Sequence, residues 1–308
     1  MLFTAFASRR RLRQQKNLVN RRISLVKRFG KYLLHECVAQ GGITEIWMAT
    51  DEYENVVAVR KLRGRGLSAS GPKLFKAGLK VHRKLSPHPN VIRFINHGKT
   101  DGTPFMVLQY IEGADLKAML SRQHDMVDNI ADVLVQMADG LNHLHDRGWI
   151  HLDYKPENIM VSLNGHVSLI DFDTAQKMPR KPKKYPKISG TPSYMPPEQL
   201  KGEAVDQRAD IYAWGSTAYE LLTHLRPFGG RTPEESRQNQ LDEKYRVKPV
   251  HQYNPQVPVA LSQLIGNCLA HKPEARYPTM TVMNARLHRI LGVQHQPVAA
   301  LHSLALAS

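Results

Sequence analysis

Two short polar motifs carry side chains that could transfer a phosphoryl group from a metal-bound nucleotide. The first reads HLDYKPEN over residues 151–158, and Asp171 of the second, IDFD at 170–173, follows Asn158 by thirteen residues. The carboxylate of Asp153 could orient an attacking hydroxyl and accept its proton. The side-chain oxygens of Asn158 and Asp171 could hold the magnesium ions that neutralise a triphosphate.

A predicted β-hairpin brings the two metal-binding candidates together. Its strands, 159–163 and 166–170, are apolar-rich and are joined by Asn164-Gly165, a dipeptide that accepts the positive φ of a type I′ turn. The candidates stand at the two ends of this hairpin, so their oxygens are expected to share one pole. The alternative is an ordinary surface hairpin with a solvated aspartate.

The positive charge of the chain is concentrated near its start. The sequence has 308 residues and a net charge of +16, and residues 1–35 and 55–100 contain ten and eleven Lys or Arg without a single acid. Such a field favours an acidic protein, an anionic membrane or a nucleic acid as a partner of the N-terminal third. A solvated face that serves solubility is the alternative, and for 55–100 the two are balanced.

Cysteine content and hydropathy indicate a cytoplasmic location. Only two cysteines occur, Cys37 and Cys268, in no pairing pattern, which is typical of a reducing compartment. The sequence contains no run of eighteen apolar residues, so no membrane-spanning helix is predicted.

The pattern of elements predicts an α+β fold with a small β-rich part followed by a larger helical part. The first part has five predicted strands, at 32–39, 45–51, 56–62, 91–97 and 105–109. Its one helix follows the start signal Ser70-Gly71-Pro72 and carries Phe75, Leu79 and His82 on an apolar face. After residue 113 the chain becomes helical.

These motifs and this order resemble the eukaryotic-type Ser/Thr protein kinase family over about residues 30–291. Two further segments support the resemblance: GTPSYMPPE at 190–198 and DIYAWG at 210–215. The resemblance pairs Arg276 with Glu198. It implies a two-lobed protein-kinase-like fold whose parts are a basic N-terminal arm at 1–29, an N-lobe at 30–108, a C-lobe at 109–291 and an uncharged tail at 292–308.

The resemblance also implies the residues of the active site. It gives catalytic roles to Asp153, Lys155 and Asn158, metal binding to Asn158 and Asp171, and the substrate pocket to Thr191. The expected cofactors are ATP and Mg²⁺ or Mn²⁺. The implied ATP-binding residues are Ala39, Gly41, Gly42, Ile46, Ala58, Arg60, Lys61, Leu108, Gln109, Tyr110 and Ile111.

Several positions depart from the family pattern. Of the three glycines expected in the nucleotide loop only Gly41 remains, with Gly42 beside it. Arg60 stands at the position of the β-strand lysine, and alternation sends Lys61 to the opposite face. Gly78 replaces the helix glutamate that would pair with that lysine, and Glu45 is one candidate substitute acid.

Two more changes follow in the second part. Leu152 replaces the arginine before the catalytic aspartate, so switching by loop phosphorylation is less expected, and Asp173 replaces the glycine after Asp171-Phe172. The predicted function is phosphoryl transfer to Ser or Thr hydroxyls of proteins. A catalytically impaired pseudokinase acting as a scaffold or regulatory binding module is the alternative, and a small-molecule kinase is a more distant one. The basic segment before residue 190 favours acidic peptides, or is a solvated loop.

Overall fold

The computed structural model describes residues 26–63, 71–122, 130–185 and 190–293. The chain divides into two compact units. The first comprises residues 1–72 and 94–110, and the second comprises residues 73–93 and 111–308. Among the described residues, no helix is both long and apolar enough to span a bilayer.

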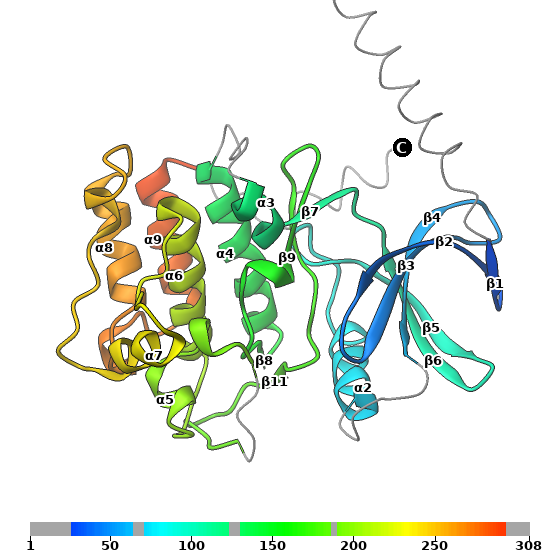
Figure 1. Cartoon of the computed structure of the whole chain (residues 1–308), viewed down its shortest axis with the longest axis horizontal. Coiled ribbons are helices and arrows are strands. Elements are labelled where there is room, and N and C mark those ends of the chain that lie inside the picture. Colours follow the sequence, from blue (N-terminus) through cyan, green and yellow to red (C-terminus); the bar gives the residue numbers. More distant parts are fainter. Residues whose placement is uncertain (1–25, 64–70, 123–129, 186–189, 294–308) are drawn as a thin grey trace, which may run out of the picture. The chain divides into compact units, whose positions relative to one another are not determined.

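The first unit is a curled antiparallel sheet (Figure 1). Its strand order within the described residues is β1-β2-β3-β4-β6-β5. The strands are β1 (Lys27–Phe29), β2 (Tyr32–Gln40), β3 (Thr44–Thr50), β4 (Val56–Leu62), β5 (Phe94–Thr100) and β6 (Thr103–Gln109).

This sheet has one strand more than the five that the sequence predicts. Lys27–Phe29 was expected within the N-terminal arm, but it pairs with β2 through a turn at Gly30, whose φ is 59°. Phe29 is buried in the core of the unit, where its ring meets Phe105 edge-on at 5.3 Å. A second difference concerns the strand expected at 91–97. It begins only at Phe94; Val91 belongs to the second unit and forms a bridge there with Leu169.

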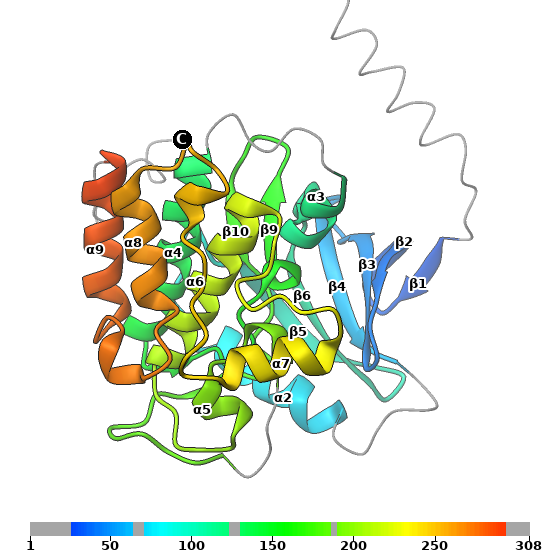
Figure 2. The same ribbon diagram turned by 60° about the vertical axis from the view of Figure 1, so that its left-hand side comes forward.

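The second unit is mainly helical. Its helices are α2 (Gly71–His82, which starts at the unit boundary), α3 (Leu116–Arg122), α4 (Ile130–Asp146), α5 (Pro197–Leu200), α6 (Arg208–Thr223), α7 (Pro233–Leu241), α8 (Val259–Cys268) and α9 (Met280–Leu291). Helices α4, α6, α8 and α9 lie side by side in Figures 1 and 2. Residues 209–222 of α6 are all buried, so this helix forms the centre of the unit.

Short strands in the second unit position the polar motifs. These strands are β7 (Gly113–Asp115), β8 (Trp149–Ile150), β9 (Ile159–Ser162), β10 (Val167–Leu169) and β11 (Gln176–Lys177). The predicted hairpin is confirmed: β9 and β10 are antiparallel, with Val161 opposite Val167, and Gly165 has a φ of 80°. Most of the basic N-terminal arm and most of the uncharged tail lie outside the described residues.

Candidate active site

A buried carboxylate holds the backbone of the loop that carries Asp153. Asp210, on α6 and with no exposed surface, accepts hydrogen bonds from the N–H groups of His151 at 2.7 Å and Leu152 at 2.8 Å. It also lies 2.7 Å from Nε2 of His145. Burial opposes ionisation of Asp210, but the contact with His145 and the neighbouring N–H outweigh it, so the pKa of Asp210 is lowered. The loop is therefore fixed by an ionised group.

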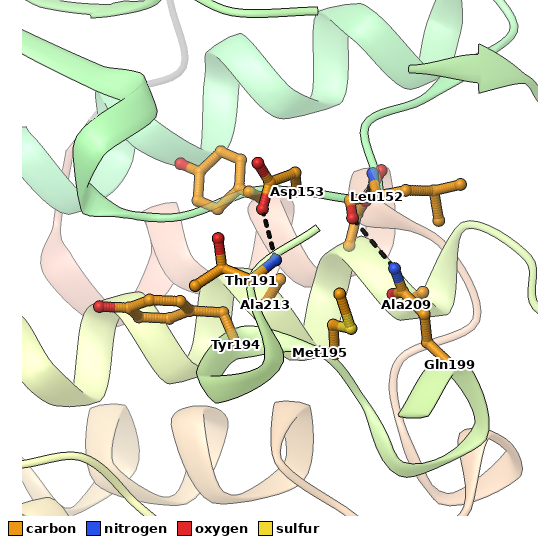
Figure 3. Close-up of a pocket in the computed structure, with 10 residues that line it drawn as sticks. Leu152, Asp153, Thr191, Tyr194, Met195, Gln199, Ala209 and Ala213 are labelled. Carbon is orange, nitrogen blue, oxygen red and sulfur yellow. Dashed lines mark hydrogen bonds between the residues drawn. The ribbon is translucent and has the colours of Figure 1, made fainter. Parts of the chain in front are cut away.

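The loop conformation requires this support. Leu152 has a φ of 62°, a left-handed conformation that a leucine rarely adopts. Its carbonyl oxygen accepts a 3.0 Å hydrogen bond from Nε2 of Gln199, as Figure 3 shows. Sequence reasoning missed Gln199, because nothing in its residue type signals a contact 47 residues away.

Asp153, Lys155 and Thr191 form a closed polar cluster. Nζ of Lys155 lies 3.0 Å from Oδ2 of Asp153 and donates a 2.6 Å hydrogen bond to Oγ1 of Thr191. The backbone N–H of Thr191 donates to Oδ1 of Asp153 at 2.8 Å (Figure 3). Each carboxylate oxygen of Asp153 thus has one fixed donor, and each retains acceptor capacity for a substrate hydroxyl. Lys155 brings a positive charge to the same point, which suits a developing phosphoryl charge.

Asn158 and Asp171 stand at the two ends of the hairpin, as predicted. The N–H of Ile170 donates to the carbonyl of Asn158 at 3.0 Å, which closes that end of the hairpin. The side-chain amide of Asn158 donates to the carbonyl of Asp153 at 2.8 Å, so its nitrogen is occupied and its Oδ1 is the atom left for a metal ion. Asp171 accepts a 3.0 Å hydrogen bond from the N–H of Asp173.

This pair of oxygen donors fits magnesium. Mg²⁺ is usually bound by one or two carboxylates together with waters and substrate phosphates, and not by a complete protein cage. In keeping with that, the described residues contain no cluster of three or more His, Cys, Asp or Glu side chains that could hold a metal by themselves. A magnesium ion held by these two oxygens would take its remaining ligands from waters and phosphate oxygens.

The candidate metal-binding segment, residues 170–173, is packed against α2 and the loop that carries Asp153. Phe172 is fully buried; its ring lies 4.8 Å from the ring of His82 on α2 and 5.8 Å from that of His151. His82, expected on an apolar helix face, is buried and packed there. Burial lowers the pKa of His151, so this histidine is an uncharged packing group in the site. Asp171 thus precedes a buried stack of aromatic rings in the sequence.

In the first unit, strand register collects five of the predicted nucleotide-binding residues on one face: Ala39, Ile46, Ala58, Arg60 and Leu108. Ala39 lies opposite Ile46, Ile46 opposite Arg60, and Ala58 opposite Leu108. Residues opposite one another in adjacent strands point to the same face of a sheet. Arg60 is buried, and its Nε donates to Oγ1 of Thr44 at 3.4 Å, on that same face.

Lys61 points to the other face and is already engaged there. Its Nζ lies 2.7 Å from Oε2 of Glu45 and 5.9 Å from the ring centres of Phe29 and Trp47. The hydrogen bond from Lys61 lowers the pKa of Glu45, so the pair is ionic. Glu45, considered above as a substitute acid for position 78, is thus bound to Lys61. The cation presented beside Ala58 is Arg60.

The glycine turn and the end of β6 complete the predicted nucleotide-binding set. The N–H of Gly41 donates to the carbonyl of Thr44 at 2.9 Å, so Gly41 and Gly42 form a tight turn between β2 and β3. A side chain at Gly42 would meet no atom within 4 Å. Gln109 ends β6, with Tyr110 and Ile111 directly after it, both half-buried.

Apolar contacts hold the segment that follows the metal motif. Strand β11 pairs with β8, and Met178 and Tyr185 pack against a buried cluster of Ile150, Leu152, Val205 and Ala209. Leu152 thus fills an apolar site where the family pattern has an arginine. These apolar contacts and the strand pairing anchor the segment.

Known protein kinases are similar to this chain over most of its length. Residues 32–288 match the family described as protein kinase domain. The tyrosine-protein kinase MasK of Myxococcus xanthus is 31% identical over 281 residues, covering 83% of this chain and 42% of that protein. The serine/threonine-protein kinase PknB of Mycobacterium leprae is 30% identical over 273 residues, covering 84% of this chain and 43% of that protein.

A probable serine/threonine-protein kinase of Clostridium perfringens is also 30% identical, over 264 residues that make up 84% of this chain and 38% of that protein. The chain therefore spans about two fifths of the length of these relatives. Because the family match runs from the second strand of the sheet to the last helix, the chain belongs to the eukaryotic-type protein kinase family.

Proposed function

We propose that this chain transfers the terminal phosphoryl group of ATP to serine or threonine hydroxyls of proteins. The observation that carries the proposal is the cluster of Asp153, Lys155 and Thr191, in which the carboxylate has one fixed donor on each oxygen. A substrate hydroxyl placed at this carboxylate would lose its proton to Asp153 as it attacks, while Lys155 would balance the charge of the transferred group.

The metal sites of the proposal are Asn158 and Asp171. Mg²⁺ or Mn²⁺ held there would neutralise the phosphates of ATP. This chain's own contribution is to fix the two oxygen donors at the end of the β9–β10 hairpin, through the bond from Ile170 to Asn158 and the packing of Phe172.

The nucleotide would lie on the face of the sheet that carries Ala39, Ile46, Ala58, Arg60 and Leu108. The Gly41–Gly42 turn would lie at its phosphates. Gln109, Tyr110 and Ile111 would lie at its adenine. Arg60 acts as the clamp cation, since Lys61 is held by Glu45 on the opposite face. A guanidinium is planar and binds phosphate in a fork, so the geometry of the clamp differs from that of a lysine.

Serine and threonine are preferred to tyrosine as acceptors. Lys155 and Thr191 match the family pattern of Ser/Thr-directed members, and their side chains are bonded to each other at 2.6 Å. Of the relatives named above, two are described as serine/threonine kinases and one as a tyrosine kinase, at nearly equal identity.

The test is transfer of labelled phosphate from ATP, with Mg²⁺ or Mn²⁺, to the chain itself and to carrier proteins, followed by identification of the phosphorylated amino acid. Asp153→Ala is expected to abolish transfer, and Glu243→Ala, a change at an exposed side chain, is the matched control. Phosphotyrosine as the main product would refute the proposed acceptor. A folded parent chain that transfers nothing would favour the pseudokinase, which the replacement of a helix acid by Gly78 also favours.

Acidic peptides are the proposed substrate class. Lys181, Lys183 and Lys184 are exposed on the segment that follows the metal motif. A basic surface beside a substrate site attracts acidic chains and loses that attraction at high salt. Changing the three lysines to glutamate is expected to lower the rate on acidic peptides and leave neutral ones unaffected; an unchanged preference would contradict it.

The basic N-terminal region is proposed to bind an acidic protein, an anionic membrane or a nucleic acid. Because Phe29 belongs to the core of the sheet, the truncation that tests this removes residues 1–25 and keeps β1. Loss of retention on anionic vesicles or nucleic acid at low salt is expected. A cytoplasmic location is proposed from the two cysteines, which are both free thiols.

A further inference from the structure

Gly78 of α2 and Asp173 of the metal-binding segment occupy one another's space. A Cβ added to Gly78 would lie 2.3 Å from Oδ1 of Asp173 and 3.4 Å from its Cα. Cβ atoms do not approach other atoms that closely, so any side chain at position 78 would displace the carboxylate. A glycine inside a helix weakens it. The glycine at position 78 is explained by the space that it leaves for the carboxylate of Asp173.

The carboxylate of Asp173 is enclosed. Asp173 is buried, with 9% of its surface exposed, and its backbone N–H donates to Oδ1 of Asp171 at 3.0 Å. The neighbouring Phe172 packs on His82, one helical turn beyond Gly78. Burial of an ionised carboxylate is unfavourable unless its charge is paired and hydrogen-bonded. Phe172 and Asp173 thus lie against His82 and Gly78, which are one helical turn apart on α2.

Helix α2 itself brings no negative charge to this place. It contains Lys73, Lys76 and Lys80 and no acid, and no acid occurs anywhere in residues 55–100. A glutamate at position 78 would put its carboxylate next to the metal-binding segment. The structure puts the carboxylate of Asp173 against that same position, from the loop instead of from the helix.

We propose that Asp173 is a positioning residue of the nucleotide site: its carboxylate supplies the negative charge that α2 lacks, and the nucleotide clamp depends on that charge. This inference rests on the proposed nucleotide binding. It makes Gly78 and Asp173 a compensating pair. The two positions can exchange their residue types: Gly78→Glu places an acid on the helix, and Asp173→Gly makes room for it.

The experiment measures the dissociation constant of Mg²⁺–ATP by calorimetry on the full chain and on Asp173→Asn, Asp173→Gly, Gly78→Glu and the double variant Gly78→Glu/Asp173→Gly. Each single change is expected to weaken binding about tenfold, and the double variant to recover to within about threefold of the parent. Gly266→Glu is the matched control, since Gly266 also lies within a helix and a Cβ there meets no atom within 4 Å.

Three outcomes overturn the inference. In the first, Asp173→Asn binds like the parent, which would leave the side chain a space-filling role. In the second, the folded double variant is no better than Asp173→Gly. In the third, saturating Mg²⁺ abolishes the defect, which would make Asp173 a metal ligand. If binding follows the expected pattern but the parent transfers no phosphate, the inference stands and the proposed function fails. If the parent transfers phosphate but the pattern is absent, the reverse holds.

Discussion

The ammonium of Lys155 donates a 2.6 Å hydrogen bond to the hydroxyl oxygen of Thr191, while the backbone N–H of Thr191 bonds to the carboxylate of Asp153. Thr191→Val removes only the side-chain acceptor. Lys155 then loses one of its two fixed partners, and we expect kcat to fall about tenfold with little change in KM for ATP. Steady-state kinetics test this, with Thr191→Ser as the control that keeps the hydroxyl. Equal rates for the Val and Ser variants would contradict the positioning role of Thr191.

The buried ion pair between Glu198 and Arg276 is expected to dominate the stability of the second unit. Two hydrogen bonds of 2.7 and 2.9 Å join the groups, as the family resemblance predicted, and both residues are about 5% exposed. Glu198→Ala leaves a buried, unpaired guanidinium, so the free energy of unfolding should fall by about 3–5 kcal/mol.

The matched control for that change is the exposed pair of Lys272 and Glu243, 3.6 Å apart with 69% and 58% of their side chains exposed. Lys272→Ala should cost less than about 1 kcal/mol. Denaturant titrations of both variants make the comparison. Similar losses for the two would show that the buried pair has no special weight.

The stability of the fold is expected to decline in mild acid through His88. Its ring is stacked on His143 at 4.5 Å, and burial, together with the charge of that neighbour, lowers the pKa of His88 from 6.5 to about 4. Between these values the unfolded chain binds more protons than the folded one. The contribution of a neutral His88 is therefore complete above pH 6.5 and is lost as the pH falls toward 4.

We expect His88→Gln to flatten the dependence of Tm on pH between 7.5 and 5. Exposed His224, at the end of α6, provides the control substitution His224→Asn, which suits its left-handed backbone. Thermal melts at several pH values are the measurement. A slope in His88→Gln as steep as that of the parent would exclude His88 as the cause.

The segment after the metal motif should depend on apolar contacts for its order. Met178→Asp places a charge against Leu152 and its cluster, so the segment should detach, with faster tryptic cleavage after Lys183 or Lys184 and about tenfold lower kcat/KM. Gln176→Asp, at an exposed position of the same segment, is the control.

Removal of phosphate from the parent by a phosphatase should leave its rate of transfer unchanged, because position 152 is a leucine and offers no arginine to pair with a phosphorylated residue.

Local sequence patterns predicted the elements of the site well. Strand alternation separated Arg60 from Lys61, since period-two geometry leaves no other arrangement in an unbroken strand. The Asn164-Gly165 dipeptide located the hairpin that joins the metal candidates, because few residues tolerate its backbone. The pairing of Glu198 with Arg276 came from the family resemblance alone.

What the sequence could not predict depends on distant contacts. Gly78 and Asp173 are separated by more than ninety residues, so no periodicity relates them. Strand β1 has only three residues, two of them charged, and its pattern is too short to distinguish from an arm. Val91 was expected to belong to a strand of the sheet, but it forms a bridge with Leu169 in the second unit, to which both residues belong.

The orientation of Arg60 has a consequence for chemical labelling. An ATP analogue that carries an amine-reactive acyl group at its terminal phosphate modifies neutral amines, and a guanidinium, which stays protonated, offers none. The amine of Lys61 lies on the far face of the sheet, bound to Glu45. A proteome-wide survey that identifies members of this family by the acylated lysine of that strand would therefore pass over this chain, even in a cell where it is abundant and folded.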